Sequence, residues 1–194
     1  GSSVSSNTSV TIDNTPPQST SITITPSSSV VTGTALTCSA TFVDAEDGAL
    51  TPTYAWSIAG ASLTTGTSYT VSANDTNVGD VIDCVATVTD SDGNTVSDTA
   101  SVTVDNTDPT VTNVTISSVS GTFYNEDVLI CSATVSDVDE VVTETITWTQ
   151  NGSPISSGYS IDLSIFNISP NDSIVCEVNV VDSNSGAASG SDTI

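Results

Sequence analysis

Apolar residues alternate with mostly polar ones along several short stretches of the chain. Every second position is apolar in residues 36–42, 54–58 and 82–88. Alternation with period two is typical of a β-strand that buries one face, and Thr on the other face favours the strand further. Apolar residues at helical spacing occur nowhere over a useful length, so the sequence predicts an all-β protein. The same alternation is found in residues 129–135, 146–148, 159–163 and 174–180.

The chain contains two copies of one unit, because its motifs recur 92 or 93 residues later. Self-similarity at a fixed period is the signature of a repeat architecture. It predicts two domains, residues 13–104 and residues 105–194. The recurring pairs are Trp56 and Trp148, Cys38 and Cys131, Cys84 and Cys176, and Asp13-Asn14-Thr15 and Asp105-Asn106-Thr107.

Residues 1–12 align with the last predicted strand of the first copy. Val10-Thr11-Ile12 corresponds to Val102-Thr103-Val104, again 92 residues later. At the other end Ile194 aligns with Val102, about two residues before that strand would be complete. Residues 1–12 are therefore either the last strand of a preceding repeat in a longer array or a donor strand that completes a neighbouring subunit. A Ser/Thr-rich tail that aligns by composition alone is the third interpretation.

The four cysteines are distributed two per copy, and the chain has no His to share a zinc site with them. This usage predicts disulfides, which we expect between Cys38 and Cys84 and between Cys131 and Cys176. Disulfides of this kind form in an oxidising compartment. We therefore expect a secreted or cell-surface protein.

Each copy places a Cys on an early strand, a Trp on the next strand and a second Cys on a late strand, which is the immunoglobulin pattern. With the linkers TIDNTPP (11–17) and TVDNTDP (103–109) and the turn DSDGN (90–94), the chain resembles the tandem immunoglobulin-like or PKD-like repeats of large microbial surface and extracellular filament proteins. The resemblance implies two tandem β-sandwich domains preceded by an extra N-terminal strand. It also implies that Trp56 and Trp148 are core residues.

The charge of the chain excludes several functions. Its 194 residues include 23 acidic side chains and no Lys, Arg or His, for a net charge of −23. Such a chain offers no cation to nucleic-acid phosphates or to an anionic membrane surface. It also lacks an amine for a Schiff base, an imidazole base, and the Gly-x-Ser-x-Gly motif of many hydrolases. The longest apolar stretches are four or five residues, too short to span a membrane. We expect a protein that is not an enzyme.

Acidic residues concentrate at three places that share one end of an immunoglobulin-like sandwich: the start of the domain, the loop after the second strand, and the last hairpin. Carboxylate and amide oxygens are the ligands that Ca²⁺ requires, and placement at a domain junction is similar to that in cadherin-like proteins. The alternative is that they are solvated turn residues, since Asp and Gly suit hairpin turns. The candidate ligands are Asp13, Asn14, Asp44, Glu46 and Asp90 in the first copy, and Asp105, Asn106, Asp108, Asp137, Asp139, Glu140 and Asp182 in the second.

Asn-x-Ser/Thr sequons predict N-glycosylation if the source glycosylates its exported proteins. The sequon at Asn151 is disfavoured by Pro154 just beyond it. The remaining candidates are Asn7, Asn74, Asn113, Asn167 and Asn171.

These observations predict a structural or adhesive segment of an extracellular rod or filament. Its expected partners are copies of itself or neighbouring repeats. The alternative is an adhesin module that binds a carbohydrate or a receptor through its loops. Phe123 and Tyr124 are the loop-edge aromatics that such a module would use.

Overall fold

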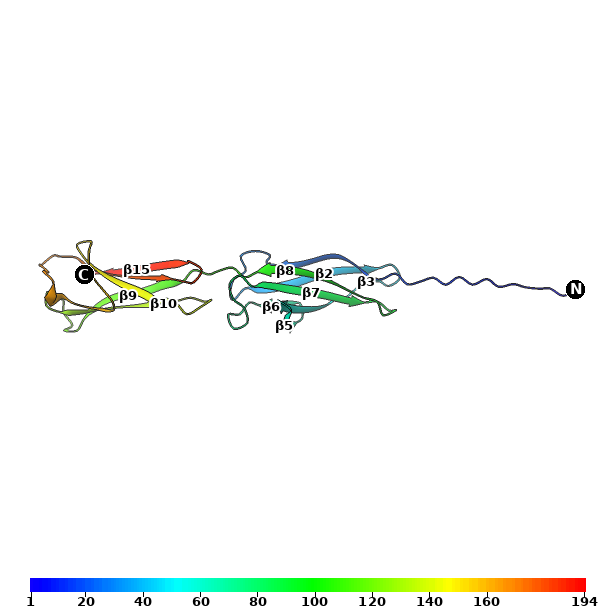
Figure 1. The fold of residues 1–194 in the computed structure, drawn as a ribbon, viewed down its shortest axis with the longest axis horizontal. Coiled ribbons are helices and arrows are strands. Elements are labelled where there is room, and N and C mark those ends of the chain that lie inside the picture. Colours follow the sequence, from blue (N-terminus) through cyan, green and yellow to red (C-terminus); the bar gives the residue numbers. More distant parts are fainter. The chain divides into compact units, whose positions relative to one another are not determined.

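The computed structural model describes residues 1–194 and confirms the all-β prediction. It contains fifteen strands and a single short 3₁₀ turn at Leu163–Ile165, and no helix long and apolar enough to cross a membrane. The chain forms two compact units (Figure 1). Unit 1 comprises residues 1–71 and 80–104, and unit 2 comprises residues 72–79 and 105–194.

Unit 1 is built from two antiparallel sheets. In the first sheet the central strand is β2, which pairs with β1, β3 and β6, and in the second the order is β5-β4-β7-β8. The strands of the first sheet are β1 (Gln18–Thr25), β2 (Ala35–Asp44), β3 (Gly48–Leu50) and β6 (Ser68–Thr70). Those of the second are β4 (Thr53–Ile58), β5 (Ala61–Thr65), β7 (Val81–Thr89) and β8 (Thr95–Thr103).

Unit 2 repeats this arrangement with sheets of order β13-β10-β9 and β12-β11-β14-β15. The first sheet consists of β9 (Thr110–Ser118), β10 (Val128–Ser136) and β13 (Ser160–Asp162). The second consists of β11 (Glu144–Gln150), β12 (Ser153–Ser157), β14 (Ile174–Val181) and β15 (Ala187–Thr193).

The alternation seen in the sequence becomes alternating burial. Along β2 every second side chain from Leu36 to Asp44 is buried and those between are exposed, which is the outcome expected when one face of a sheet packs on another sheet. The prediction holds only in part at residues 159–163. Ile161 and Leu163 are buried as expected, but the strand covers only residues 160–162 and Tyr159 is exposed, with its hydroxyl donating a hydrogen bond to Glu144 Oε1.

Disulfides and tryptophans join the two sheets of each unit. Cys38–Cys84 links β2 to β7, and Cys131–Cys176 links β10 to β14. Trp56 and Trp148 are completely buried, and each lies opposite the second Cys of its own unit, in the same register. Their indole N–H groups donate to the carbonyls of Gly66 and Gly158 at 2.9 and 2.8 Å, so the polar atom of each ring is satisfied inside the core.

Residues 1–12 form no strand within this chain, although their pattern predicts one. The first strand begins at Gln18. Val4, Val10 and Ile12 are 94%, 88% and 90% exposed. Neither sandwich of the same chain therefore covers the apolar side chains of this segment.

Candidate functional site

An aspartate at the end of β2 organises the acidic loop of unit 1. The Oδ1 atom of Asp44 accepts hydrogen bonds from the backbone N–H groups of Glu46 and Asp47 at 2.9 and 2.8 Å. A carboxylate that caps its own turn in this way is the usual reason for Asp at such a position. The Asp47 carboxylate in turn accepts hydrogen bonds from the backbone and hydroxyl of Ser91, at 2.7 and 2.9 Å. The loop is thereby tied to the β7–β8 hairpin.

The corresponding loop of unit 2 is built in the same way. The Oδ1 atom of Asp137 accepts from the backbone N–H groups of Asp139 and Glu140, at 2.7 and 3.4 Å. The Glu140 carboxylate accepts from the backbone of Ser183 in the β14–β15 hairpin, at 2.5 Å. In addition, Asp139 accepts from the backbone N–H of Thr107 at 2.7 Å, which connects the loop to the start of the unit.

A buried hairpin aspartate holds the start of each unit against its last hairpin. Asp90 and Asp182 are only 6% and 7% exposed. Their Oδ1 atoms accept backbone N–H groups of their own hairpins, and their Oδ2 atoms accept the side-chain amides of Asn14 and Asn106, both at 2.8 Å. The Asn of the Asp-Asn-Thr linker motif is therefore explained by this contact between residues 76 positions apart.

These hydrogen bonds favour the charged carboxylates. Burial alone would raise the pKa of Asp90, but hydrogen bonds from Asn14 and Asn94 outweigh it and lower the pKa below its ordinary value. The hydrogen bond from Asn106 lowers the pKa of Asp182 against the opposing effect of burial. A lowered pKa means that the folded state binds the proton more weakly than the unfolded chain. The resulting stabilisation is present above the ordinary pKa and is lost as the pH falls through the lowered value.

The side chains brought together here are not arranged as a ready cation site. No group of three or more Asp, Glu, Cys or His side chains has a geometry that could hold a metal ion. The Oδ2 atoms of Asp44 and Asp137 are nevertheless buried without a hydrogen-bond partner, as are Oδ1 of Asp139 and Oγ1 of Thr107. Asp44 as a whole is 7% exposed. Burying a carboxylate oxygen without a hydrogen-bond donor costs free energy. The Oδ2 atoms of Asp44 and Asp137 occupy the same position in the two units, and each would be stabilised by a donor or a cation.

Some of the candidate calcium ligands take part in the hydrogen bonds described above, and others do not. Asp13, Asp105 and Asp108 are exposed and take no part in these hydrogen bonds. Glu46 contributes a single weaker contact, from the Thr15 hydroxyl at 3.3 Å. The connected residues are Asn14, Asp44 and Asp90 in unit 1, and Asn106, Asp137, Asp139, Glu140 and Asp182 in unit 2.

Gly186 is a residue of this site that the sequence does not reveal. A Cβ atom at this position would lie 2.3 Å from Asp182 Oδ2, 2.5 Å from Asp108 Oδ1 and 2.9 Å from Asn106 Nδ2. Any other residue would therefore push the two carboxylates and the amide apart. The only signal in the sequence is a Gly in a predicted hairpin, which a turn explains equally well.

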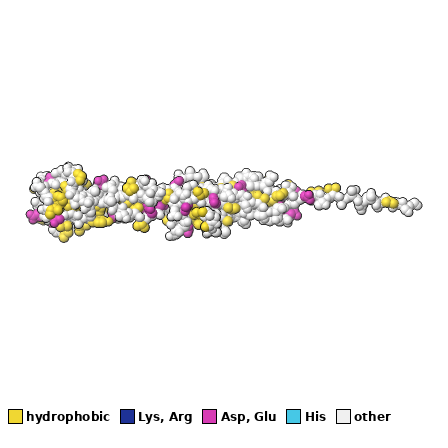
Figure 2. Space-filling model, in the orientation of Figure 1, with side chains coloured by type: hydrophobic (Ala, Val, Ile, Leu, Met, Phe, Trp, Pro, Cys, Tyr) yellow, Lys and Arg dark blue, Asp and Glu magenta, His cyan; other side chains and the backbone are white.

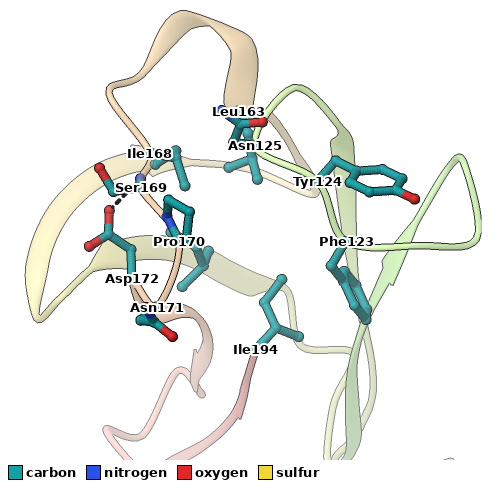
Figure 3. Close-up of a pocket in the computed structure, with 11 residues that line it drawn as sticks. Phe123, Tyr124, Asn125, Leu163, Ile168, Ser169, Pro170, Asn171, Asp172 and Ile194 are labelled. Carbon is teal, nitrogen blue, oxygen red and sulfur yellow. Dashed lines mark hydrogen bonds between the residues drawn. The ribbon is translucent and has the colours of Figure 1, made fainter.

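A second candidate site is an apolar pocket of about 730 Å³ within residues 123–194 of unit 2 (Figure 3). In Figure 3 Phe123 lies on one side of the pocket and Ile168, Pro170 and Asp172 lie on the other, with Ile194 between them. Phe123 is 55% exposed at the rim. The Tyr124 ring points away from Ile168 and Pro170, so of the two loop-edge aromatics Phe123 is the one that faces the pocket.

No protein-family model matches this chain, and a search of curated proteins finds no relative.

The candidate glycosylation sites all lie on the surface. Asn7, Asn74, Asn113, Asn167 and Asn171 are exposed. The structure adds a reason to discount Asn151, because its side-chain amide donates to Asp172 at 2.7 Å and its carbonyl accepts from the Ser173 backbone at 2.9 Å. A glycan on that amide nitrogen would compete with its hydrogen bond to Asp172.

Proposed function

We propose that this chain is a structural or adhesive segment of an extracellular protein made of tandem immunoglobulin-like repeats, in which the domains form a rod or filament. The observation that carries the proposal is that the same disulfide-closed pair of sheets is built twice, with the same Trp-to-Cys register and the same linker contact. Each unit has its own hydrophobic core, which suits a protein that is extended by repetition.

The path of the chain through each unit supports a rod. In unit 1 the linker residue Asn14 contacts Asp90, directly after β7, whereas the last residue Val104 donates to the carbonyl of Asp80, directly before β7. The nine residues of β7 separate these points by about 30 Å. A domain that the chain enters at one end and leaves at the other produces a string when it is repeated.

The surface and the disulfides support a location outside the cell. Cys38–Cys84 and Cys131–Cys176 are the kind of bond that persists in oxidising compartments. Acidic side chains are the only charged side chains, as the magenta atoms of Figure 2 show. The absence of Lys and Arg also removes every cleavage site for trypsin-like proteases. We propose a secreted or cell-surface protein, glycosylated at exposed sequons where the source permits.

Pulling single molecules by force tests the mechanical role. We expect two separate unfolding events, one for each unit, and an extension limited by the disulfides. The loop between Cys38 and Cys84, which are separated by 46 positions, cannot be stretched while the bond is intact. A reductant should lengthen the extension of unit 1 by about 150–165 Å. Units that extend without a resolvable force peak would contradict a load-bearing role.

The alternative is a module that binds a carbohydrate or receptor through its loops. The exposure of Phe123 and Tyr124 beside an apolar pocket favours it. Sugar recognition usually places an aromatic ring against the sugar, whereas both Trp residues of this chain are in the cores. We therefore rank the structural role first.

Calcium binding at the acidic end of each unit is part of the proposal, supported by the unsatisfied oxygens of Asp44 and Asp137. Because no three carboxylates converge in this structure, the ion would have to draw them together, and we expect an affinity in the range of extracellular modules, about 10⁻⁴–10⁻³ M. Calorimetric titration should give heat, and Ca²⁺ should raise the melting temperature of both units. Asp137→Asn should remove the effect in unit 2, whereas Asp105→Asn, an exposed control, should not.

The absence of both heat and a melting-temperature change at 10-fold above that range would contradict calcium binding. The acidic residues would then be turn formers only, which their backbone hydrogen bonds already explain.

A further inference from the structure

A cavity of about 210 Å³ lies between the segment that leads into β1 and the end of β2. Its lining residues are Thr15, Pro16, Gln18, Val43, Asp44 and Ala45. Asp44 is the one acidic residue among them, and it is 7% exposed. Its Oδ1 atom accepts the two backbone N–H groups of the following loop, whereas its Oδ2 atom is buried without a hydrogen-bond partner. The wall of the cavity therefore contains a buried carboxylate oxygen that lacks a donor.

No side chain compensates the charge around this oxygen. Glu46 and Asp47 follow within three positions of Asp44, and the chain contains no Lys, Arg or His. The Thr15 hydroxyl donates to Glu46 Oε1 at 3.3 Å, so a second carboxylate lies beside a residue that lines the cavity. A water molecule would donate a hydrogen bond to Asp44 but would leave the repulsion between the carboxylates in place. A cation would satisfy the oxygen and also neutralise the charge.

Unit 2 has the same feature at the same positions of the repeat. Thr107 Oγ1, Asp137 Oδ2 and Asp139 Oδ1 are all buried without a hydrogen-bond partner. The three residues are adjacent in space, because the Thr107 N–H donates to Asp139 Oδ2 and the Asp139 N–H donates to Asp137 Oδ1, both at 2.7 Å. Their counterparts in unit 1 are Thr15, Asp44 and Glu46. Both units therefore leave buried acidic oxygens unsatisfied where the linker meets the loop after the second strand.

We infer that each unit binds one Ca²⁺ ion at this place, which we call the linker site. The protein ligands are the side-chain oxygens of Thr15, Asp44 and Glu46 in unit 1 and of Thr107, Asp137 and Asp139 in unit 2. Two carboxylates and a hydroxyl leave several of the roughly six to eight positions around the ion for backbone carbonyls and water. The inference rests on the proposed function, since it assigns the ligands of the calcium site and gives the ion a role.

The hairpin aspartates are not ligands, although they belong to the same acidic end of each unit. Both carboxylate oxygens of Asp90 and of Asp182 already accept hydrogen bonds from N–H groups. A cation at either residue would have to displace donors that already stabilise the charged carboxylate. The linker site instead offers oxygens that have no donor to lose.

An ion at the linker site ties the linker to the domain. In unit 1 the hydroxyl of Thr15 attaches the linker to the loop at 3.3 Å, whereas in unit 2 the backbone N–H of Thr107 attaches it at 2.7 Å. The longer contact in unit 1 gains more from an ion that binds both segments. Calcium therefore regulates the flexibility of the linker, and it does so more strongly at the start of unit 1 than at the start of unit 2.

The first test is an NMR titration of the isotope-labelled 194-residue chain with CaCl₂, with NaCl at matched ionic strength as the reference. Asp44→Asn keeps an oxygen for the N–H groups of the loop but removes the charge. The site of unit 1 should then bind Ca²⁺ at least about 10-fold more weakly, since even residues that only orient a metal ligand have effects of this size. The site of unit 2 in the same molecule is the internal reference and should not change.

Two further variants locate the site. Thr15→Val removes the hydroxyl with little change of shape and should weaken the site of unit 1 from the linker side. Asp13→Asn is the matched control for Asp44→Asn, because it removes the same charge from an exposed position of the same linker. It should leave the affinity of both sites unchanged.

The second test measures the linker itself. Heteronuclear NOEs of backbone amides report motion on the picosecond-to-nanosecond timescale. Saturating CaCl₂ should raise the NOEs of residues 13–15 in the wild-type chain and should raise those of residues 105–107 by less. The same CaCl₂ concentration should leave residues 13–15 of the Asp44→Asn chain unchanged.

Shifts that NaCl reproduces, or an Asp13→Asn chain that loses affinity as strongly as Asp44→Asn, would indicate diffuse counterions and overturn the inference. An Asp44→Asn chain that binds Ca²⁺ as the wild type does would overturn it too, while calcium binding through other ligands would stand. Linker amides that do not respond at saturation would overturn the regulatory role. A chain that binds no Ca²⁺ but still gives two force peaks would leave the structural role intact while this inference fails.

Discussion

Replacing both Cys38 and Cys84 with Ala lowers the free energy of unfolding of unit 1 by about 4 kcal/mol. The disulfide closes a loop of 46 residues, and the chain-entropy model assigns this value to the constraint that such a loop places on the unfolded chain. Domains of this size have about 5–15 kcal/mol of net stability, so the loss is a large share of the total. Differential scanning calorimetry should show one of two transitions moving to lower temperature.

The matched control is the Cys131→Ala, Cys176→Ala pair. Its loop of 45 residues is nearly identical, so the same loss should appear in the other transition and thereby assign the transitions to their units. Equal shifts of both transitions in either variant would mean that the two units unfold together. A loss below about 1 kcal/mol would mean that the unfolded chain is already compact without the bond.

Trp148→Ala is expected to destabilise unit 2 by about 3–5 kcal/mol, the usual range for removal of a fully buried large aromatic side chain. The ring is completely buried between the sheets, next to the Cys131–Cys176 bond, and its N–H satisfies the Gly158 carbonyl. Urea denaturation followed by far-UV circular dichroism measures the loss.

Two further variants separate packing from hydrogen bonding at this position. Trp148→Phe keeps much of the ring but leaves the Gly158 carbonyl without its donor, so we expect a smaller loss of about 1–3 kcal/mol. Tyr159→Ala removes an exposed aromatic and should change stability by less than about 0.5 kcal/mol. If Trp148→Ala were as mild as Tyr159→Ala, the core of unit 2 would not be organised around this ring.

The fold class followed from the sequence because burial on one face of a strand requires a period of two, and that period is visible without any knowledge of the neighbours. Residues 36–42 show it without interruption, and β2 buries every second side chain along its length. The period does not extend to Tyr159, which precedes β13 and is exposed, with its hydroxyl hydrogen-bonded to Glu144. The residue at which a strand ends depends on contacts with other segments, and the local sequence pattern carries no information about those contacts.

The sequence by itself determined the two copies, the cysteine pairs and the grouping of acidic residues at one end of each copy. Recurrence at a fixed spacing and a turn-forming residue type are properties of the chain alone. Only the tertiary structure decided which acidic oxygens accept hydrogen bonds. Asp182 is bound by Asn106 from 76 residues away, Asp137 keeps a buried oxygen unsatisfied, and Asp105 remains outside. These differences arise because strand pairing and hydrogen-bond competition act between segments that are distant in sequence.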